Sequence, residues 1–319
     1  MQFSSFLKYF PPPKFLNPVR IGISFSDLSI KAIIFEKGSF GPVVKSIMVP
    51  LNPGIIKEGV ILKEEDLVNK LLEVRNNFGS SFVSFTIPDE ITYIFKTSVP
   101  VVNGRDATES IAFSIEENVP ISLSDTIFDF VPTEVRRTDT GYEASFVVSA
   151  CVKKEVEKII SSLERAGFDT LCGIPESQAV ANSVVPKGSD GFSCIVHVRD
   201  NRVGMYLVNK NIVTFATIRT LSSLDYDTQI ADEYEKFSEY YNKYGDLKGT
   251  PIKSIFVCGE FDYAKKVVSI ISKNQSLSGK VTLSNIWSNT SSLKGEIPNL
   301  PYDKSLSFAG SVGAAVTKI

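Results

Sequence analysis

The chain has 319 residues, of which 43% are hydrophobic, enough to bury a core in two or more lobes. Its formal net charge of −2 gives no electrostatic reason to expect a nucleic-acid partner. No apolar run reaches the roughly 20 residues of a membrane-spanning helix, and the N-terminus lacks the apolar region of a signal peptide. The four cysteines are far apart and there is one histidine, which predicts reduced thiols, no metal site and a cytoplasmic location.

The first 18 residues, MQFSSFLKYFPPPKFLNP, differ from the rest of the chain. Aromatic residues and two lysines are interrupted by three consecutive prolines, which exclude a long amphipathic helix. We therefore expect residues 1–18 to form a flexible lead. It either packs its aromatic side chains on the first lobe or makes an interfacial contact with lipid or a membrane-bound partner.

From residue 20 the sequence predicts the strands and helices of a first lobe. The apolar runs RIGISF, SIKAIIFEK and PVVKSIMVP favour strands, and a helix is expected over Glu64–Phe78, where apolar side chains share one face. Two more strands and, much later, a helix at Glu176–Val185 complete the pattern. The first lobe is therefore expected to comprise residues 19–97 and 168–186.

The segment 98–167 has a different pattern, helix–strand–turn–strand–helix, and interrupts the first lobe. Each of its two helices carries an apolar stripe, and the second ends at Gly167, a residue typical of helix C-termini. The sequence predicts a small inserted α+β module. Its expected core residues are Ile111, Ile115, Val156 and Leu163.

After the linker PKGSDG, residues 190–319 begin again with strand–turn–strand, as the first lobe does. A long helix over about 225–244, the strand SIFVCG and a further helix follow. The last expected helix, about 305–317, is rich in glycine and alanine and permits close backbone approach. The repeated start indicates an internal duplication, with 190–319 as a second lobe.

Three segments, taken together in their order and spacing, resemble the PilM family, actin-like cytoplasmic proteins of type IV pilus assembly, and the related FtsA. They are LNPGIIKEGVILKEEDL (51–67), ENVPISLSDTIFDF (117–130) and AGFDTLCGIPESQAVANSVV (166–185). The resemblance runs from about residue 20 to the C-terminus. It implies an α/β, actin-like (ribonuclease H-like) two-lobed fold with the module inserted in the first lobe.

In actin-like ATPases two hairpins, one per lobe, hold the nucleotide phosphates, and each carries an Asp-x-Gly pattern. The acid positions Mg²⁺, and the glycine lets backbone N–H groups approach the phosphates. By resemblance, Ser24 stands at the Asp position of the first hairpin and Ser26 at its Gly position. Ser29 and Lys31 could still offer a hydroxyl and a positive charge to phosphate, although the sequence also favours Lys31 as a solvated strand lysine. Asp27 lies at the turn and does not replace the missing acid.

In the second hairpin His197 stands at the Asp position and Arg199 at the Gly position. A neutral imidazole is a poor partner for Mg²⁺, and Arg199 could either bind phosphate or fill its space. One glycine, Gly259, remains of the family's adenosine-side pair, and Glu176 is the only acid near the hydrolytic position. We therefore predict no catalytic or metal-binding residues and a vestigial nucleotide cleft in which ATP or ADP could still bind. Its expected residues are Ser24, Ser26, Ser29, Lys31, Arg199 and Gly259.

The resemblance implies a cytoplasmic scaffold of type IV pilus, or type II secretion-like, assembly. It would be peripheral to the inner face of the cell membrane through the cytoplasmic tail of a PilN-like inner-membrane protein. The tail would bind between the first lobe and the module, around Ser84–Pro100 and the helix Arg105–Asn118, by strand addition or as a helix in a groove.

Two alternatives stay open. One is an ATPase with a rearranged site in which Ser24, Ser29, Lys31 and Arg199 bind phosphate. The other is an FtsA-like cell-division filament protein, disfavoured because the chain stops at SVGAAVTKI without the amphipathic membrane helix typical of FtsA. The oligomeric state is left open.

Overall fold

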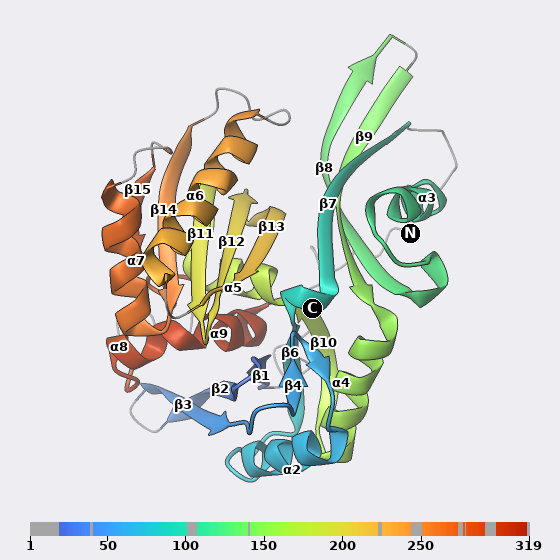
Figure 1. Ribbon diagram of the computed structural model, residues 1–319. Helices are drawn as coiled ribbons and strands as arrows, with labels where there is room; N and C mark the ends of the chain where they lie inside the picture. Colours follow the sequence, from blue (N-terminus) through green and yellow to red (C-terminus); the bar gives the residue numbers. More distant parts are fainter. Residues whose placement is uncertain are drawn as a thin grey trace.

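The computed structural model describes residues 19–38, 41–100, 107–139, 141–222, 225–243, 251–273, 277, 279–290 and 298–317. The lead expected over residues 1–18 lies outside the described residues. Two lobes, each built on a five-stranded sheet, lie next to each other, and a third sheet rises beside them (Figure 1).

The first-lobe sheet has the order β10-β6-β1-β2-β3. Its first three strands form antiparallel hairpins, and β6 and β10 join β1 in parallel. The helices α2 (Glu64–Arg75) and α4 (Lys153–Arg165) pack against each other on this lobe. The strands are β1 (Ile21–Phe25), β2 (Ser29–Gly38), β3 (Gly41–Pro50), β6 (Phe82–Ile87) and β10 (Asp169–Pro175), with a small side hairpin of β4 (Ile56–Lys57) and β5 (Val60–Ile61).

The second-lobe sheet, β13-β12-β11-β14-β15, repeats this connectivity. Its first three strands are again antiparallel hairpins, and β14 and β15 are again parallel to the first strand. The predicted internal duplication is therefore confirmed. The elements are β11 (Phe192–Arg199), β12 (Arg202–Asn209), β13 (Ile212–Thr220), α6 (Tyr226–Lys243), β14 (Ile252–Gly259), α7 (Phe261–Lys273) and β15 (Lys280–Leu283).

Two helices join the lobes. The helix α5 (Glu176–Val184) contacts β12 and β13, and α9 (Ala309–Val316) contacts β1, β2 and β6; α9 follows the short helix α8 (Tyr302–Ser305) and a 3₁₀ turn, η5 (Leu306–Phe308). A Cβ on Gly313 would lie 1.6 Å from the carbonyl oxygen of Ala179, so α9 and α5 are in backbone contact. This is the close approach that the glycine-rich sequence predicts. A shared apolar core from both lobes surrounds the pair.

The inserted module consists of the sheet β7-β9-β8 and the helix α3 (Ala107–Asn118). Its strands are β7 (Thr92–Pro100), β8 (Thr126–Thr138) and β9 (Gly141–Val152), with a 3₁₀ turn, η3 (Leu123–Asp125), before β8. The helix α3 packs on one face of the sheet, and β8 and β9 continue beyond it as a projecting hairpin (Figure 1). The buried core of the module contains Val99, Ile111, Ile115, Val119, Ala144, Phe146, Val148 and Ala150.

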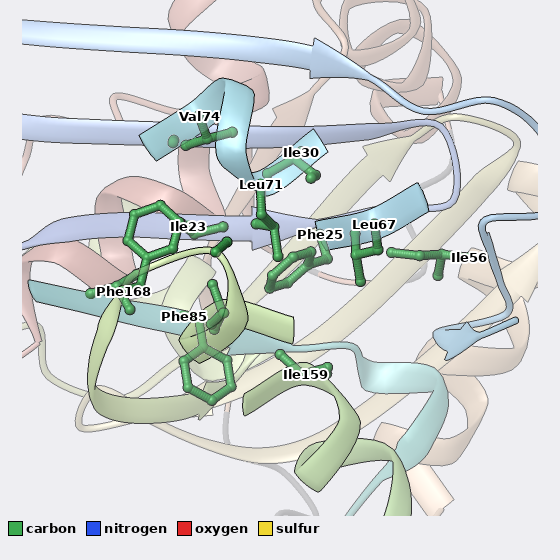
Figure 2. Close-up of a cluster of buried hydrophobic side chains, with 14 of the residues drawn as sticks. Ile23, Phe25, Ile30, Ile56, Leu67, Leu71, Val74, Phe85, Ile159 and Phe168 are labelled. Carbon is green, nitrogen blue, oxygen red and sulfur yellow. The ribbon is translucent and has the colours of Figure 1, made fainter. Parts of the chain in front are cut away.

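The predicted module core is wrong in one respect. Val156 and Leu163 of α4 are buried in the first-lobe core, with residues such as Leu71 and Phe85, and not with Ile111. Figure 2 shows this core, where Ile159 of α4 lies beside the first-lobe strands. The elements that share the module core run from residue 92 to 152, and the predicted segment was 98–167. An apolar stripe fixes which face of a helix is buried but not which neighbour buries it.

Candidate functional site

The hairpins that hold phosphate in actin-like ATPases meet here at the cleft between the lobes. The second-lobe hairpin turns over two residues, Asp200 and Asn201, and Asp200 has a positive φ of 48°. This tight turn places Arg199 and Arg202 opposite each other at the ends of β11 and β12. Both arginines point toward the first lobe, and both are buried, with 6% and 5% of their surface exposed.

Arg199 contacts three separate segments of the first lobe. Its Nη2 donates to Glu90 Oε1 at 2.8 Å and lies 2.8 Å from Glu176 Oε2. Its Nη1 reaches the carbonyl oxygen of Phe25 at 3.5 Å. Glu90 lies in the 3₁₀ turn η2 (Asp89–Ile91), and Glu176 in the first turn of α5.

Arg202 extends the same network. Its two Nη atoms donate to Asp27 Oδ2 at 2.6 Å and Oδ1 at 3.3 Å, a two-pronged pairing that arginine makes well. Its Nη1 also donates to Glu90, which therefore bridges the two arginines. We name the set of Asp27, Glu90, Glu176, Arg199 and Arg202 the clamp. It joins the second-lobe hairpin to the first-lobe hairpin, to η2 and to α5.

The carboxyl groups of this region titrate differently because their surroundings differ. Burial raises the pKa of Glu176 to about 8, and the nearby Arg199 offsets only part of that rise. Burial likewise raises the pKa of neighbouring Asp89 to about 6, although Asp89 accepts hydrogen bonds from Ser177 N and Oγ at 2.9 and 2.8 Å. For Glu90 the attraction of Arg199 and Arg202 outweighs burial, so its pKa is lowered. Glu90 is therefore ionised at neutral pH, whereas burial favours the protonated form of Glu176.

The three serines predicted in the cleft bond among themselves or to α9. Ser26 Oγ lies 3.1 Å from Ser29 Oγ and also accepts from Ser29 N at 3.1 Å, which closes the first hairpin. Ser24 Oγ lies 3.4 Å from Ser311 Oγ. Their hydroxyls serve the fold locally.

Lys31 contacts the second lobe, and Gly259 packs against a neighbouring strand. Lys31 is only 6% exposed and its Nζ lies 2.9 Å from Glu260 Oε1 of the second lobe, so it is not a solvated strand lysine. Gly259 has φ +113°, and a Cβ there would lie 1.7 Å from the carbonyl oxygen of Val198. Contact with β11 therefore accounts for the glycine.

His197 is buried, and its Nδ1 lies 3.4 Å from Tyr206 Oη. Burial, with Arg199 and Lys31 nearby, lowers the pKa of His197 well below its ordinary value. The imidazole is therefore neutral, and its contact is local.

The residues at the phosphate position do not fit a nucleotide. The cavity that remains between the two hairpins has a volume of about 10 Å³, which is at most the room of one water molecule. Arg199 lines this cavity and pairs with Glu90 and Glu176 across it. Among the described residues, no group of three His, Cys, Asp or Glu side chains could hold a metal ion. The residues that line the cavity of about 10 Å³ are Ser24, Phe25, Ser26, Ser29, Lys31, Glu176, His197, Arg199, Ser307 and Gly310.

A much larger groove, about 810 Å³, lies next to the clamp. Consecutive residues of β13, Ala216–Ile218, and of the segment Ile91–Tyr93 line it. Neighbouring residues of a strand point to opposite faces, so the groove runs along the strand edges. Both β13 and β7 are edge strands of their sheets. The remaining lining residues are Lys57, Glu58, Val60, Leu62, Asp89, Glu90, Arg202 and Thr220.

Sequence reasoning did not find Asp27, Glu90 and Arg202 as members of the clamp. The tail-binding site expected around Ser84–Pro100 and the helix Arg105–Asn118 stays a prediction; no residue of α3 lines the 810 Å³ groove. The one available signal was the pair of arginines, Arg199 and Arg202, flanking a two-residue turn.

The duplicated five-stranded sheets, the two joining helices and the module inserted in the first lobe define an actin-like fold, as predicted. Among solved structures, the chain is similar to a chain of the "PilM-PilN type IV pilus biogenesis complex", with a TM-score of 0.75 and 14% identity over 93% of this chain and 98% of that one. It is also similar to the cytoplasmic domain of EpsL, an inner-membrane component of the type II secretion system of Vibrio cholerae, with a TM-score of 0.51 and 9% identity over 76% and 82% of the two chains.

A third similar structure is the ethanolamine utilization protein EutJ from Carboxydothermus hydrogenoformans, with a TM-score of 0.51 and 12% identity over 96% and 90% of the chains. No family model and no curated protein sequence matches the chain. At these identities the similarity establishes the fold. No helix among the described residues has the length and apolar character needed to cross a membrane.

Proposed function

We propose that this protein is an actin-like scaffold of type IV pilus, or type II secretion-like, assembly. It works in the cytoplasm and binds the cytoplasmic tail of a PilN-like inner-membrane protein, without ATP hydrolysis. The observation that carries the proposal is the similarity to the PilM–PilN structure over 93% of the chain, which is too extensive to leave out the inserted module. Attachment to the membrane is then supplied by the partner.

The groove beside the clamp supports the binding of an extended tail. Two strand edges, β13 and β7, face it, and an exposed strand edge offers backbone hydrogen bonds to an incoming strand. Leu62, Ile91 and Ile218 add apolar surface for alternate side chains of that strand. The groove volume is within the usual range for ligand sites.

The clamp supports the absence of hydrolysis. Arg199 occupies the phosphate space, and Ser24 and His197, at the positions expected to hold acids, offer no carboxylate for Mg²⁺. A nucleotide would have to displace Arg199 from Glu90 and Glu176, which would leave buried charge without a partner.

The test is calorimetric titration with a synthetic peptide that has the sequence of the PilN-like protein's cytoplasmic tail. Ile218→Glu places a charge in the groove and should weaken binding at least tenfold, about 1.4 kcal/mol. Leu72→Glu is the matched control, because Leu72 is exposed on α2, away from the groove. Failure of the wild-type protein to bind the peptide would contradict the proposed function.

One further variant separates two possible binding sites. Phe113, on the predicted tail-binding helix, is 72% exposed and does not line the groove. Phe113→Glu should leave the affinity unchanged. If it weakens binding and Ile218→Glu does not, the tail binds at α3 and the assignment to the groove is wrong.

A further inference from the structure

The clamp lies in the cleft between the lobes and joins one lobe to the other. At the base of the cleft, α5 and α9 hold the lobes together through backbone contact and a shared apolar core. At the cleft itself, ion pairs and hydrogen bonds of two arginines make the connection. Arg199 and Arg202 come from one short hairpin of the second lobe, whereas their three acidic partners come from three separate first-lobe segments.

Like a ligand bound between two lobes, the arginines of the clamp contact both sides of the cleft. In a nucleotide-dependent actin-like protein, the ligand contacts both hairpins and so links the lobes. Here Arg199 fills the space between the hairpins and itself contacts the opposite lobe, leaving a cavity of about 10 Å³. Arginine stays charged at any physiological pH and is part of the chain, so these contacts do not depend on the concentration of a ligand.

The clamp and the groove share residues. Glu90 and Arg202 belong to the clamp and also line the 810 Å³ groove. One wall of that groove is β13 of the second lobe, and the opposite wall is formed by the β4–β5 hairpin, η2 and the start of β7. A change in the angle between the lobes therefore changes the width of the groove.

We infer that the clamp replaces nucleotide as the element that holds the two lobes closed, and that it thereby keeps the groove at the width its ligand needs. The second half of this inference rests on the proposed function. The two lobes thus stay closed without a bound nucleotide. Partner binding is coupled to lobe closure, and nucleotide has no part in it.

The experiment compares backbone amide hydrogen exchange and tail-peptide binding in clamp variants. Arg199→Ala alone would leave buried carboxyl groups without their cation, so the main variant is the double substitution R199A/E176Q. Arg199→Lys, which keeps the charge but loses the planar fork, is a milder second variant. The matched control is Arg165→Ala, because Arg165 pairs with Glu64 and Glu65 entirely within the first lobe.

In R199A/E176Q we expect exchange in residues 56–61 and 212–220 to become faster, and peptide affinity to fall, each on the order of tenfold. Arg165→Ala should change neither. A folded double variant with wild-type exchange in both segments would overturn the inference, and if that variant does not fold, unchanged exchange in Arg199→Lys does so.

The two proposals fail separately. If exchange rises but peptide affinity stays at the wild-type value, the link between clamp and groove is wrong. If the wild-type protein binds no tail peptide, the proposed function fails, and the exchange measurements still decide whether the clamp closes the lobes.

Discussion

The contact between α9 and α5 gives a sharp prediction for Gly313→Ala. The added methyl group would lie 1.6 Å from the carbonyl oxygen of Ala179 and 2.4 Å from its carbonyl carbon, both backbone atoms that cannot rotate away. The helices must move apart, and overpacking of this kind costs about 1–3 kcal/mol or more. Alanine recovers about 1 kcal/mol of helix propensity. Because the atoms in contact are backbone atoms, we take the upper end of that range, about 3 kcal/mol, and expect a net loss of about 2 kcal/mol in the free energy of unfolding.

Gly310 provides the control on the same helix. A Cβ at Gly310 would meet only side-chain atoms, the closest being Ser24 Cβ at 3.2 Å. The helix-propensity gain then offsets a mild contact, so Gly310→Ala should be within about 0.5 kcal/mol of wild type. Urea denaturation followed by circular dichroism measures both variants, with the midpoint compared at unchanged slope. If the two alanines shift the midpoint equally, or Gly313→Ala does not shift it, the backbone contact between α5 and α9 is not as described.

Three further predictions follow from the module core, the buried carboxyl and the filled cleft. Ile115→Asp should place a charge in the module core and cost several kcal/mol there, so hydrogen exchange should rise in residues 92–152 while the first-lobe core stays protected; uniform exchange across both would contradict a separate core. The folded-state pKa of Glu176, about 8, is above its ordinary 4.5, so its contribution to stability is complete below pH 4.5 and is lost as the pH rises through 8. Glu176→Gln should remove this slope, at most about 1.4 kcal/mol per pH unit, in denaturation midpoints measured across that interval, and an unaltered slope would show that another group titrates. Millimolar Mg-ATP should neither raise the melting temperature nor release phosphate above a blank, and a clear rise in melting temperature would mean that Arg199 yields to nucleotide.

Most of the fold could be predicted from the sequence because the signals for its strands and helices are local. Buried apolar runs predict the strands, and the same strand–turn–strand start at Ile21 and again at Phe192 predicts the duplication. The assignment of α4 failed because the stripe through Val156 and Leu163 would be the same on any sheet. Which sheet a helix packs on is determined by the tertiary structure, and the periodicity within the helix does not encode it.

The clamp could be predicted only in part. The loss of both acids and both glycines from the hairpins is visible in the residues at 24, 26, 197 and 199. The contacts that form the clamp are not visible in the sequence, because Glu90 lies more than 100 residues from both arginines and is one acid among the 36 of the chain. The absence of a motif can be recognised residue by residue. A set of contacts between distant segments can be recognised only in the folded structure.

The packing of α9 on β1 also has a consequence for biosynthesis. A Cβ on Gly22 of β1 would lie 1.9 Å from the carbonyl oxygen of Ser311, so the last helix is the cover of the first strand. The strand ends at Phe25 and the helix begins at Ala309, and at about 5–20 residues per second a ribosome needs roughly 15–60 s to make the chain between them. Throughout that time the face of β1 that α9 later covers stays exposed, and chaperones or other chains can bind it. A nascent chain that stops before residue 309 lacks the helix that packs on β1, so the face of β1 beside Gly22 stays exposed.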